Sequence, residues 1–469
     1  MELLYKGIID YLKEYRDSQP DSIALFNEEY GYTVNELYEQ TTAAASFLAE
    51  HGVRCGENVG LCGLRTPETV IFFLAIQYIG AVAVLCDPHS PVSDFISEAG
   101  DDIAVSHIID NDDGCWYIDG IAYGKGKFLG TEGSAISKPD LKAPAVIIFT
   151  SGSTGQRKGV IHSQFSYINH QQNFYTVSGC EGNDRGLFLL PLFHIYGLTQ
   201  AVDGIMHQYS NFFPREVTPD YICKCIEKYR LTRVALVPSL ALAMSQVIIQ
   251  KGYDVSSLRQ ACVAGAYTSR EQFNYIQETL GVKLVPVYGM SECAGISGAD
   301  ASESDDDRAG SVGKILPLTQ VRIGEDGEIM IKGPTVFYGY VGEEPIDRDE
   351  FFDTGDLGFI DDKGFLHITG RKKEIVIRNG QNISISYLEN TLRSLDFVQD
   401  AAVVGIEDEK CGEVPAAVIM LKAGAAYNED AVTALFNKLE RPERIRIVDK
   451  IPLKPTGKAD KQKIKEMFI

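Results

Sequence analysis

The sequence predicts an α/β protein with parallel sheets, a β-rich subdomain and a small α+β domain at its carboxyl-terminal end. Helical patterns such as residues 34–52 alternate with short apolar runs such as residues 145–150 and 233–238, which is typical of parallel sheets covered by helices. After about residue 310 the pattern changes to short strands separated by Gly and Asp turns, which indicates a small β-barrel-like subdomain. Residues 371–469 mix strands and helices, so we expect a large domain over residues 1–370 and a small one over residues 371–469.

Length, charge and cysteine content narrow the classes of function. A chain of 469 residues exceeds the ~100–200 residues of one domain. Its 44 Lys and Arg against 65 Asp and Glu give a net charge of −21, which argues against a protein that binds nucleic acid by neutralising phosphates. The ten cysteines form no CxxC pair, so we expect free thiols in a reducing compartment and a cytoplasmic protein.

One apolar segment raises the question of a membrane span. Residues 70–86 form a run of 17 residues with few polar interruptions, which is the lower limit of ~17–25 residues for a spanning helix. Gly80 divides the run into a helical part and a β-branched part that ends at Asp87. We therefore expect a helix, a turn and a buried strand, with no membrane span.

The most informative stretch is TSGSTGQRKG, residues 150–159, which follows a buried strand. Glycines at 152, 155 and 159 allow the backbone N–H groups to turn inward, hydroxyls at 151, 153 and 154 add donors, and Lys158 supplies a positive charge. We expect a strand, a phosphate-binding loop and then a helix. The spacing differs from the P-loop motif and from the GxGxxG motif.

This loop resembles the signature loop of the adenylate-forming (ANL) superfamily, which contains acyl-CoA synthetases, peptide-synthetase adenylation domains and luciferases. Five further motifs of that superfamily follow in the same order: PLFHIYGL (191–198), VPVYGMSE (285–292), FFDTGDLG (351–358), TGRKKEIVIRNGQNIS (369–384) and KPTGKADK (454–461). The second of the six has the form found in acyl-CoA synthetases, so the chain resembles an AMP-dependent carboxylate–CoA ligase.

The resemblance implies which residues bind the nucleotide and perform the chemistry. Adenylation brings a carboxylate to a phosphate, and two such charges 4 Å apart repel by ~4 kcal/mol at an effective dielectric of 20. Lys458 is expected to bridge the two anions, His194 to lie beside the carboxylate, and Glu292 to hold Mg²⁺. The residues expected to bind ATP and AMP are Thr150, Ser151, Gly152, Ser153, Thr154, Gly155, Lys158, Gly265, Ala266, Tyr288, Gly289, Met290, Ser291, Asp356 and Arg371.

The resemblance also implies a second half-reaction and a moving domain. Lys373 is expected to be the hinge about which the small domain turns, so that the face carrying Lys458 leaves and the face carrying Gly380 and Gln381 approaches the CoA thiol. The FHIYG segment lacks the Asp with which amino-acid-selecting relatives pair an ammonium group. Its apolar neighbours Phe193, Ile195, Tyr196 and Leu198 suggest an apolar acyl or aryl tail.

We therefore expect an enzyme that uses ATP, Mg²⁺ and CoA to convert a small carboxylic acid into its CoA thioester through an acyl-adenylate. Two alternatives stay open: a ligase that loads an acyl carrier protein, and a catalytically silent nucleotide-binding homologue. The sequence departs from its relatives at Gln156, Arg157 and Ile385, and it is short for the superfamily. These departures concern the thiol acceptor more than the adenylation chemistry.

Overall fold

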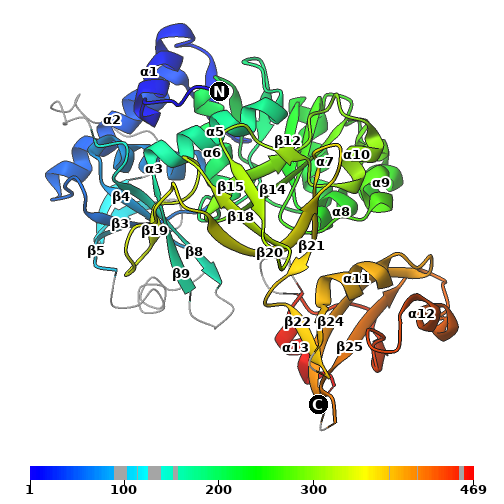
Figure 1. The fold of residues 1–469 in the computed structure, drawn as a ribbon. Helices are drawn as coiled ribbons and strands as arrows, with labels where there is room; N and C mark the ends of the chain where they lie inside the picture. Colours follow the sequence, from blue (N-terminus) through cyan, green and yellow to red (C-terminus); the bar gives the residue numbers. More distant parts are fainter. Residues whose placement is uncertain are drawn as a thin grey trace.

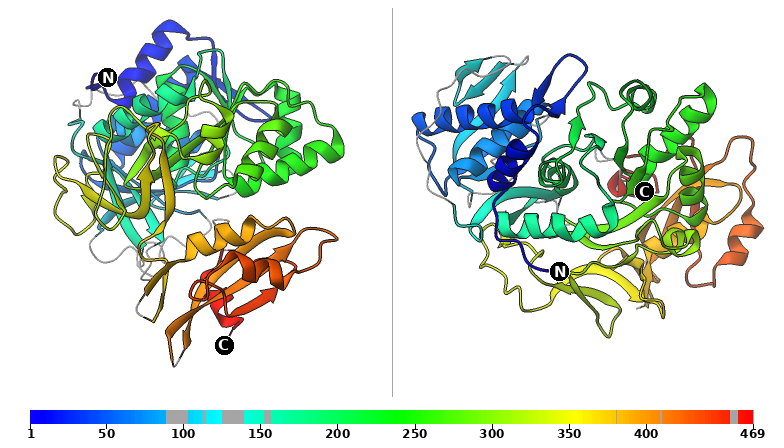
Figure 2. Two further views of the ribbon diagram at one scale, coloured as in Figure 1. Left: turned by 45° about the vertical axis from the view of Figure 1, so that its right-hand side comes forward. Right: turned by 90° about the horizontal axis from the view of Figure 1, so that it is seen from above.

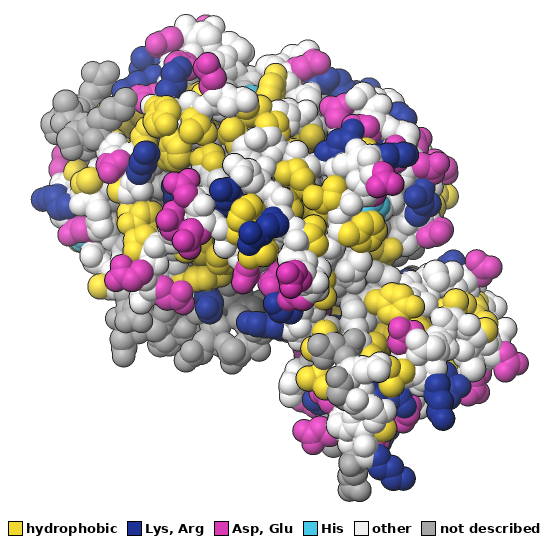
Figure 3. Space-filling view, viewed as in Figure 1, with side chains coloured by type: hydrophobic (Ala, Val, Ile, Leu, Met, Phe, Trp, Pro, Cys, Tyr) yellow, Lys and Arg dark blue, Asp and Glu magenta, His cyan; other side chains and the backbone are white. Residues whose placement is uncertain are grey.

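The computed structural model describes residues 1–88, 103–112, 115–124, 139–151, 157–379, 381–408, 410–453 and 459–468. Figure 1 shows a large body that contains two sheets with parallel central strands, and a small carboxyl-terminal body below it. In the space-filling view the small body projects from one corner of the large one (Figure 3). The α/β class and the separate carboxyl-terminal domain expected from the sequence are thus confirmed.

The nine-stranded sheet has the strand order β16-β15-β14-β13-β12-β10-β11-β1-β2. The strands from β1 and β11 to β14 run parallel, and β2, β15 and β16 pair antiparallel at the two edges. The strands are β1 (Ile23–Phe26), β2 (Gly31–Thr33), β10 (Arg185–Leu187), β11 (Ser210–Phe212), β12 (Arg233–Leu236), β13 (Gln260–Val263), β14 (Leu284–Met290), β15 (Cys293–Gly298) and β16 (Lys314–Ile315).

The eight-stranded sheet has the order β19-β9-β8-β4-β3-β5-β6-β7. Its central strands β8, β4, β3 and β5 run parallel. The strands are β3 (Asn58–Cys62), β4 (Val82–Leu85), β5 (Val105–Asp112), β6 (Cys115–Ile118), β7 (Ile121–Gly124), β8 (Pro144–Ser151), β9 (Arg157–Ser163) and β19 (Gly339–Tyr340).

Helices cover the two parallel sheets, as the views of Figure 2 show. One core cluster joins α7, α8 and α9 to the nine-stranded sheet, and a second joins α1, α2, α3, α5 and α6 to the eight-stranded sheet. The helices are α1 (Ile8–Ser18), α2 (Val34–Glu50), α3 (Pro67–Ile79), α5 (Gln164–Ser178), α6 (Ile195–Met206), α7 (Pro219–Tyr229), α8 (Pro238–Lys251), α9 (Arg270–Leu280) and α10 (Asp305–Gly310).

The apolar segment 70–86 folds as the sequence predicts. Helix α3 begins with Pro67 in its first turn and ends at Gly80, which has a φ of 80° that favours glycine, and β4 follows from Val82. Within the described part of the chain, no helix has the length and apolarity that a membrane crossing requires. The segment is a helix and a strand of the protein core.

The β-rich subdomain is a four-stranded antiparallel sheet of β17 (Gln320–Ile323), β18 (Glu328–Lys332), β20 (Phe352–Ile360) and β21 (Leu366–Arg371). Its order, β17-β18-β20-β21, leaves two edges, so the expected barrel-like form is corrected to an open sheet. Closure is unnecessary because Ile329, Ile331 and Leu366 pack in one cluster with Tyr288 and Ile296 of the larger sheet.

The small body is built on strands β22 (Ile375–Arg378), β23 (Gln381–Ser384), β24 (Val398–Asp408), β25 (Gly412–Leu421) and β26 (Arg444–Ile447), with helices α11 (Ile385–Arg393), α12 (Glu429–Leu435) and α13 (Lys461–Glu466). Two clusters, one with Leu388 and Val432 and the other with Ile464 and Phe468, form its own core on the two faces of the sheet. The body has the core of an independent small domain.

Candidate active site

The predicted nucleotide residues gather where parallel strands of the large sheet end. Strand β13 is followed by Ala264 and Gly265, and the last residues of β14 are Tyr288, Gly289 and Met290. Open parallel sheets place ligands outside the carboxyl ends of their strands. Gly265 has a φ of +88°, a conformation that favours glycine. The edge formed by these strand ends is the candidate site.

A buried carboxylate, Asp356, links the large sheet to the four-stranded sheet at this edge. The Tyr288 hydroxyl donates to Asp356 Oδ2 over 2.6 Å, and Arg371 Nε lies 2.9 Å from Asp356 Oδ1. Asp356 and Arg371 are partners in the register of β20 and β21. Burial, with the charge of Asp356 beside it, raises the pKa of Tyr288 well above its ordinary value, so this hydroxyl acts as a neutral donor. The structure thus brings together three residues that the motifs predict separately.

A second buried carboxylate, Glu292, lies in the turn between β14 and β15. It is 8% exposed, and its Oε1 accepts a hydrogen bond of 2.7 Å from the Tyr340 hydroxyl. Its backbone oxygen accepts from Phe337 N at 2.8 Å. Lys158 Nζ lies 4.4 Å from the centroid of the Tyr340 ring and 3.6 Å from Glu343 Oε1. Tyr340 therefore connects the predicted metal ligand to the predicted phosphate-binding lysine.

Tyr340 is a residue that sequence reasoning missed. It belongs to β19, a strand of two residues that pairs with β9 far away in the sequence. Burial, with the charge of Glu292 beside it, raises the pKa of Tyr340 above its ordinary value, so its hydroxyl keeps its proton. No motif includes this position, because its importance depends on a long-range pairing.

Buried His162, also missed by sequence reasoning, supports the turn that carries Ser291 and Glu292. His162 Nε2 lies 2.7 Å from the backbone oxygen of Ser291, and its Nδ1 lies 3.3 Å from Ser166 Oγ. Burial lowers the pKa of His162 to about 4, so the neutral imidazole donates its Nε2 proton to the carbonyl. The β14–β15 turn is also tight, since a Cβ on Gly289 would lie 1.9 Å from Ala294 O.

His194 is the residue that precedes the first turn of α6, and its side chain makes no capping hydrogen bond. The imidazole is half-buried, with its ring centroid 4.5 Å from that of Phe193. A Cβ on Gly197, in the first turn of α6, would lie 2.0 Å from Pro191 O, so the close approach of the preceding turn to the helix requires glycine at this position. The turn also fixes the backbone of His194, whose N–H donates to Pro191 O over 3.1 Å.

The expected loop context is corrected in one respect. The chain runs from strand β8 to a second strand, β9, which pairs antiparallel with it up to Ser151 opposite Arg157. Helix α5 begins later, at Gln164. This second strand contains the β-branched residues Val160 and Ile161, which favour strands, and Val160 is buried together with Ile147 of β8. Thr150 Oγ1 donates to Lys158 O at 3.5 Å across this hairpin.

The remaining predicted residues make no contact that defines the candidate site, or lie outside the described part of the chain. Ala266 is exposed after Gly265, and Met290 packs on the core cluster of the four-stranded sheet. Lys373 is exposed in the short turn between β21 and β22, and Gln381 is exposed at the start of β23. The predicted residues outside the described part of the chain are Gly152, Ser153, Thr154, Gly155, Gly380 and Lys458.

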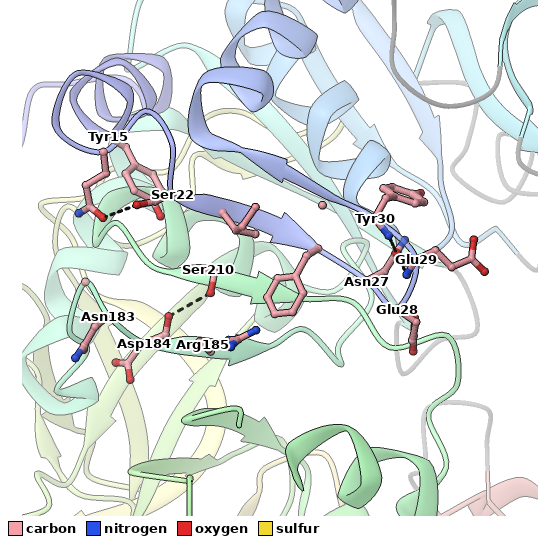
Figure 4. A pocket seen from close by; sticks show the side chains of 15 residues that line it. Tyr15, Ser22, Asn27, Glu28, Glu29, Tyr30, Asn183, Asp184, Arg185 and Ser210 are labelled. Carbon is pink, nitrogen blue, oxygen red and sulfur yellow. Dashed lines mark hydrogen bonds between the residues drawn. The ribbon is translucent and has the colours of Figure 1, made fainter. Parts of the chain in front are cut away.

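A separate hollow of about 560 Å³ lies beside β1 and the amino ends of β10 and β11, and Figure 4 shows its lining. Asp184 and Ser210 are joined there by a hydrogen bond of 3.3 Å from the hydroxyl to the Asp184 carbonyl. None of its lining residues belongs to the motifs. This hollow is not part of the candidate active site.

Family models and sequence relatives identify the family of the chain. The model of the AMP-binding enzymes matches residues 12–341, and that of the AMP-binding enzyme carboxyl-terminal domain matches residues 387–458. A 2-succinylbenzoate–CoA ligase of Bacillus cereus is 28% identical, with 96% of each chain covered. A Mycobacterium tuberculosis CoA ligase for a methyl-dioxo-octahydroindenyl propanoyl group is 27% identical, with 96% of each chain covered.

Solved structures with the same fold include CoA synthetases. The o-succinylbenzoate CoA synthetase of Bacillus subtilis, in complex with its acyl-adenylate intermediate, has a TM-score of 0.82 at 25% identity, with 98% of each chain covered. ATP-bound MatB of Rhodopseudomonas palustris, at 22% identity and 99% coverage of each chain, has a TM-score of 0.86 and shows the shared fold. The chain therefore belongs to the AMP-binding enzymes, as its six motifs predict, and both of these relatives are CoA ligases.

Proposed function

We propose that this enzyme joins a small carboxylic acid to CoA in two steps, with an acyl-adenylate between them. The observation that carries the proposal is the Tyr288–Asp356–Arg371 group at the carboxyl edge of the large sheet, in a chain that both family models match. ATP and CoA are the substrates of the relatives' class of reaction. The named acids of the two relatives carry further oxygen groups besides the carboxyl that is activated.

The nucleotide is held by the residues that the structure brings together. Asp356 accepts hydrogen bonds from the ribose hydroxyls, and Arg371 holds the carboxylate in place from the neighbouring strand. Lys158, exposed on β9, attracts the phosphates after the glycine-rich loop. Gly265 permits a close approach of the adenine ring to the backbone after β13.

Glu292 suits Mg²⁺, because hard divalent cations prefer carboxylate oxygens and one protein carboxylate suffices when phosphates supply other ligands. Its orientation is fixed by Tyr340 through Oε1. The ion, when bound with ATP, offsets the negative charge of the phosphates during attack by the carboxylate. In this proposal Glu292 holds the ion and Tyr340 orients the Glu292 carboxylate, and neither residue transfers a proton.

Lys458 stays the proposed residue that bridges the carboxylate and the α-phosphate during adenylation. The boundary at residues 370 and 371 is supported by the end of β21 at Arg371 and the exposed turn that carries Lys373. Rotation about this turn exchanges Lys458 for the face with Gly380 and Gln381, where the pantetheine thiol displaces AMP. All ten cysteines are free, which supports a reducing compartment such as the cytoplasm.

The experiment is acid-dependent exchange of labelled pyrophosphate into ATP with a panel of aliphatic and aryl acids. We expect Lys458→Ala to abolish exchange while ATP binding persists, and Lys450→Ala, a change of an exposed lysine on the same domain, to leave exchange intact. Thioester formation is then compared with CoA and with a purified acyl carrier protein, and we expect CoA to be the acceptor. Absence of exchange with every acid would contradict the proposal and favour a silent homologue.

A further inference from the structure

A small cavity with polar walls lies between the large sheet and helices α5 and α6. Its volume is about 30 Å³, which is enough for about two water-sized groups at ~10–15 Å³ each. Its lining includes Ala235 of β12 and Cys262 of β13. These two residues come two positions before Val237 and Ala264, so at ~3.3 Å per residue the near end of the cavity lies ~7 Å below the candidate active-site edge. The lining extends from there to Arg233 and Gln260, the first residues of the two strands.

Most polar groups around the cavity are already satisfied. The Asp203 carboxylate accepts from Gln171 Nε2 at 2.6 Å and from the Tyr209 hydroxyl at 2.7 Å. Arg233 Nη2 lies 3.7 Å from the same carboxylate, and its Nη1 donates to Ser178 O at 3.0 Å. These bonds fix the cavity wall and leave Asp203 little capacity for a ligand.

Two polar atoms of the lining have no partner among the described residues, namely Gln171 Oε1 and the Tyr196 hydroxyl. The Gln171 side chain is 0% exposed. Its amide orientation is certain, because Nε2 must donate to the acceptor-only carboxylate of Asp203, so Oε1 is left as an acceptor. Tyr196 can both donate and accept. Buried groups of this kind are normally paired.

The position of Tyr196 relates these two unpaired atoms to the acid-binding part of the proposed site. Tyr196 lies two residues after His194, in the first turn of α6, and it lines the cavity together with Cys262 and Arg233. Leu198, which the sequence suggested for an apolar pocket, is instead fully buried in the core cluster of the helices. The expectation of an apolar tail therefore does not fit this end of the site.

We propose, on the basis of the proposed function, that the acid used by this enzyme carries a hydrogen-bonding group at its far end, most simply a hydroxyl, which binds Gln171 Oε1 and the Tyr196 hydroxyl. A hydroxyl donates to Gln171 and accepts from Tyr196. A terminal methyl group of the same size leaves both atoms unpaired. The specificity of the enzyme is thus for polar-ended acids rather than for plain hydrocarbon chains.

The test compares two series of acids of equal chain length, one ending in a methyl group and one in which a hydroxyl replaces that methyl. kcat/KM for acid-dependent pyrophosphate release is measured for each member from four to nine heavy chain atoms. We expect kcat/KM for the best hydroxyl-ended acid to exceed that for its methyl-ended counterpart by roughly 10- to 100-fold. A larger ratio is not expected, because a water molecule can partly replace the missing hydroxyl. Equal use of the two series, which means that water alone fills the cavity, would overturn the inference.

The variant Tyr196→Phe locates the selectivity. We expect it to reduce the hydroxyl-to-methyl ratio of kcat/KM about tenfold, equivalent to ~1.4 kcal/mol, and to leave the thermal midpoint no lower than that of the unmodified enzyme, because the hydroxyl has no partner to lose. The matched control is Tyr175→Phe, whose ring is exposed on α5 outside the cavity. An unchanged ratio of kcat/KM in Tyr196→Phe would refute the assignment of the cavity to the substrate. A lack of activity of the unmodified enzyme with every acid would refute the proposed function together with this inference.

Discussion

The hydrogen bond from Tyr340 to Glu292 gives a quantitative test of the proposed metal-binding role. The bond is 2.7 Å long and joins a neutral hydroxyl to a carboxylate that is 8% exposed. Hydrogen bonds to charged groups contribute ~1.5–3 kcal/mol. Groups that orient a metal ligand typically change metal affinity ~10–100-fold when they are removed. The two ranges agree, because 1.4 kcal/mol corresponds to about a tenfold change in an equilibrium constant.

The variant Tyr340→Phe keeps the ring, and therefore its contact with Lys158, and removes only the hydroxyl. We expect the free Mg²⁺ concentration that gives half-maximal pyrophosphate release to rise ~10-fold or more, with a smaller change in the maximal rate at saturating Mg²⁺. Tyr338→Phe, two residues away and half-buried, is the control and should leave the Mg²⁺ dependence unchanged. The reasoning is refuted if Tyr340→Phe lowers the maximal rate but does not shift the Mg²⁺ dependence.

Three further outcomes follow from the site. Tyr288→Phe removes the 2.6 Å bond to Asp356, and we expect the KM for ATP to rise by about 5- to 10-fold while far-UV circular dichroism is retained; an unchanged KM would contradict the coupling of the tyrosine to the ribose site. Gly289→Ala places a Cβ 1.9 Å from the backbone oxygen of Ala294, so the thermal midpoint should fall by several degrees with loss of exchange activity, and a stable, active variant would show that the β14–β15 turn is not constrained. The pKa of His162 is held at about 4 by burial, against ~6.5 in the unfolded chain, so the unfolded state binds more protons and stability falls as pH drops from above 6.5 toward 4. Denaturant unfolding should show ~2 kcal/mol less stability from this group at pH 5 than at pH 8, and His162→Gln, which keeps a donor, should lose that part of the pH dependence.

The fold and the motif residues could largely be predicted from the sequence, because they depend on local patterns. The split of residues 70–86 at Gly80 follows from the end of the helical pattern and the β-branched residues after it. Asp356 and Arg371 each lie in a recognisable motif, and the pairing of β20 with β21 brings them together. Where one strand or turn fixes the relative positions of the residues in a motif, the sequence is sufficient to predict which residues lie together.

The remaining features depend on contacts between distant segments. Tyr340 reaches Glu292 through a two-residue strand that has too few residues to show a period. The strand after the glycine-rich loop was expected to be a helix, because its pairing with β8 is visible only once both strands are placed. The polar cavity beside Tyr196 is lined by residues of six helices and strands, and residues from so many separate segments leave no pattern in the sequence. The burial of the polar residues Gln171 and Arg233 could not be predicted from the sequence.

The register of the last two strands of the large domain has a mechanical consequence. Arg371 ends β21 directly opposite Asp356, and the exposed turn begins with the next residues. The small domain is therefore attached directly after the residue that pairs with the buried Asp356 carboxylate, the proposed ribose ligand. If Lys373 is the hinge, as proposed, we expect a change in the contact between Arg371 and Asp356 to alter the orientation of the small domain, because only two positions separate Arg371 from that hinge.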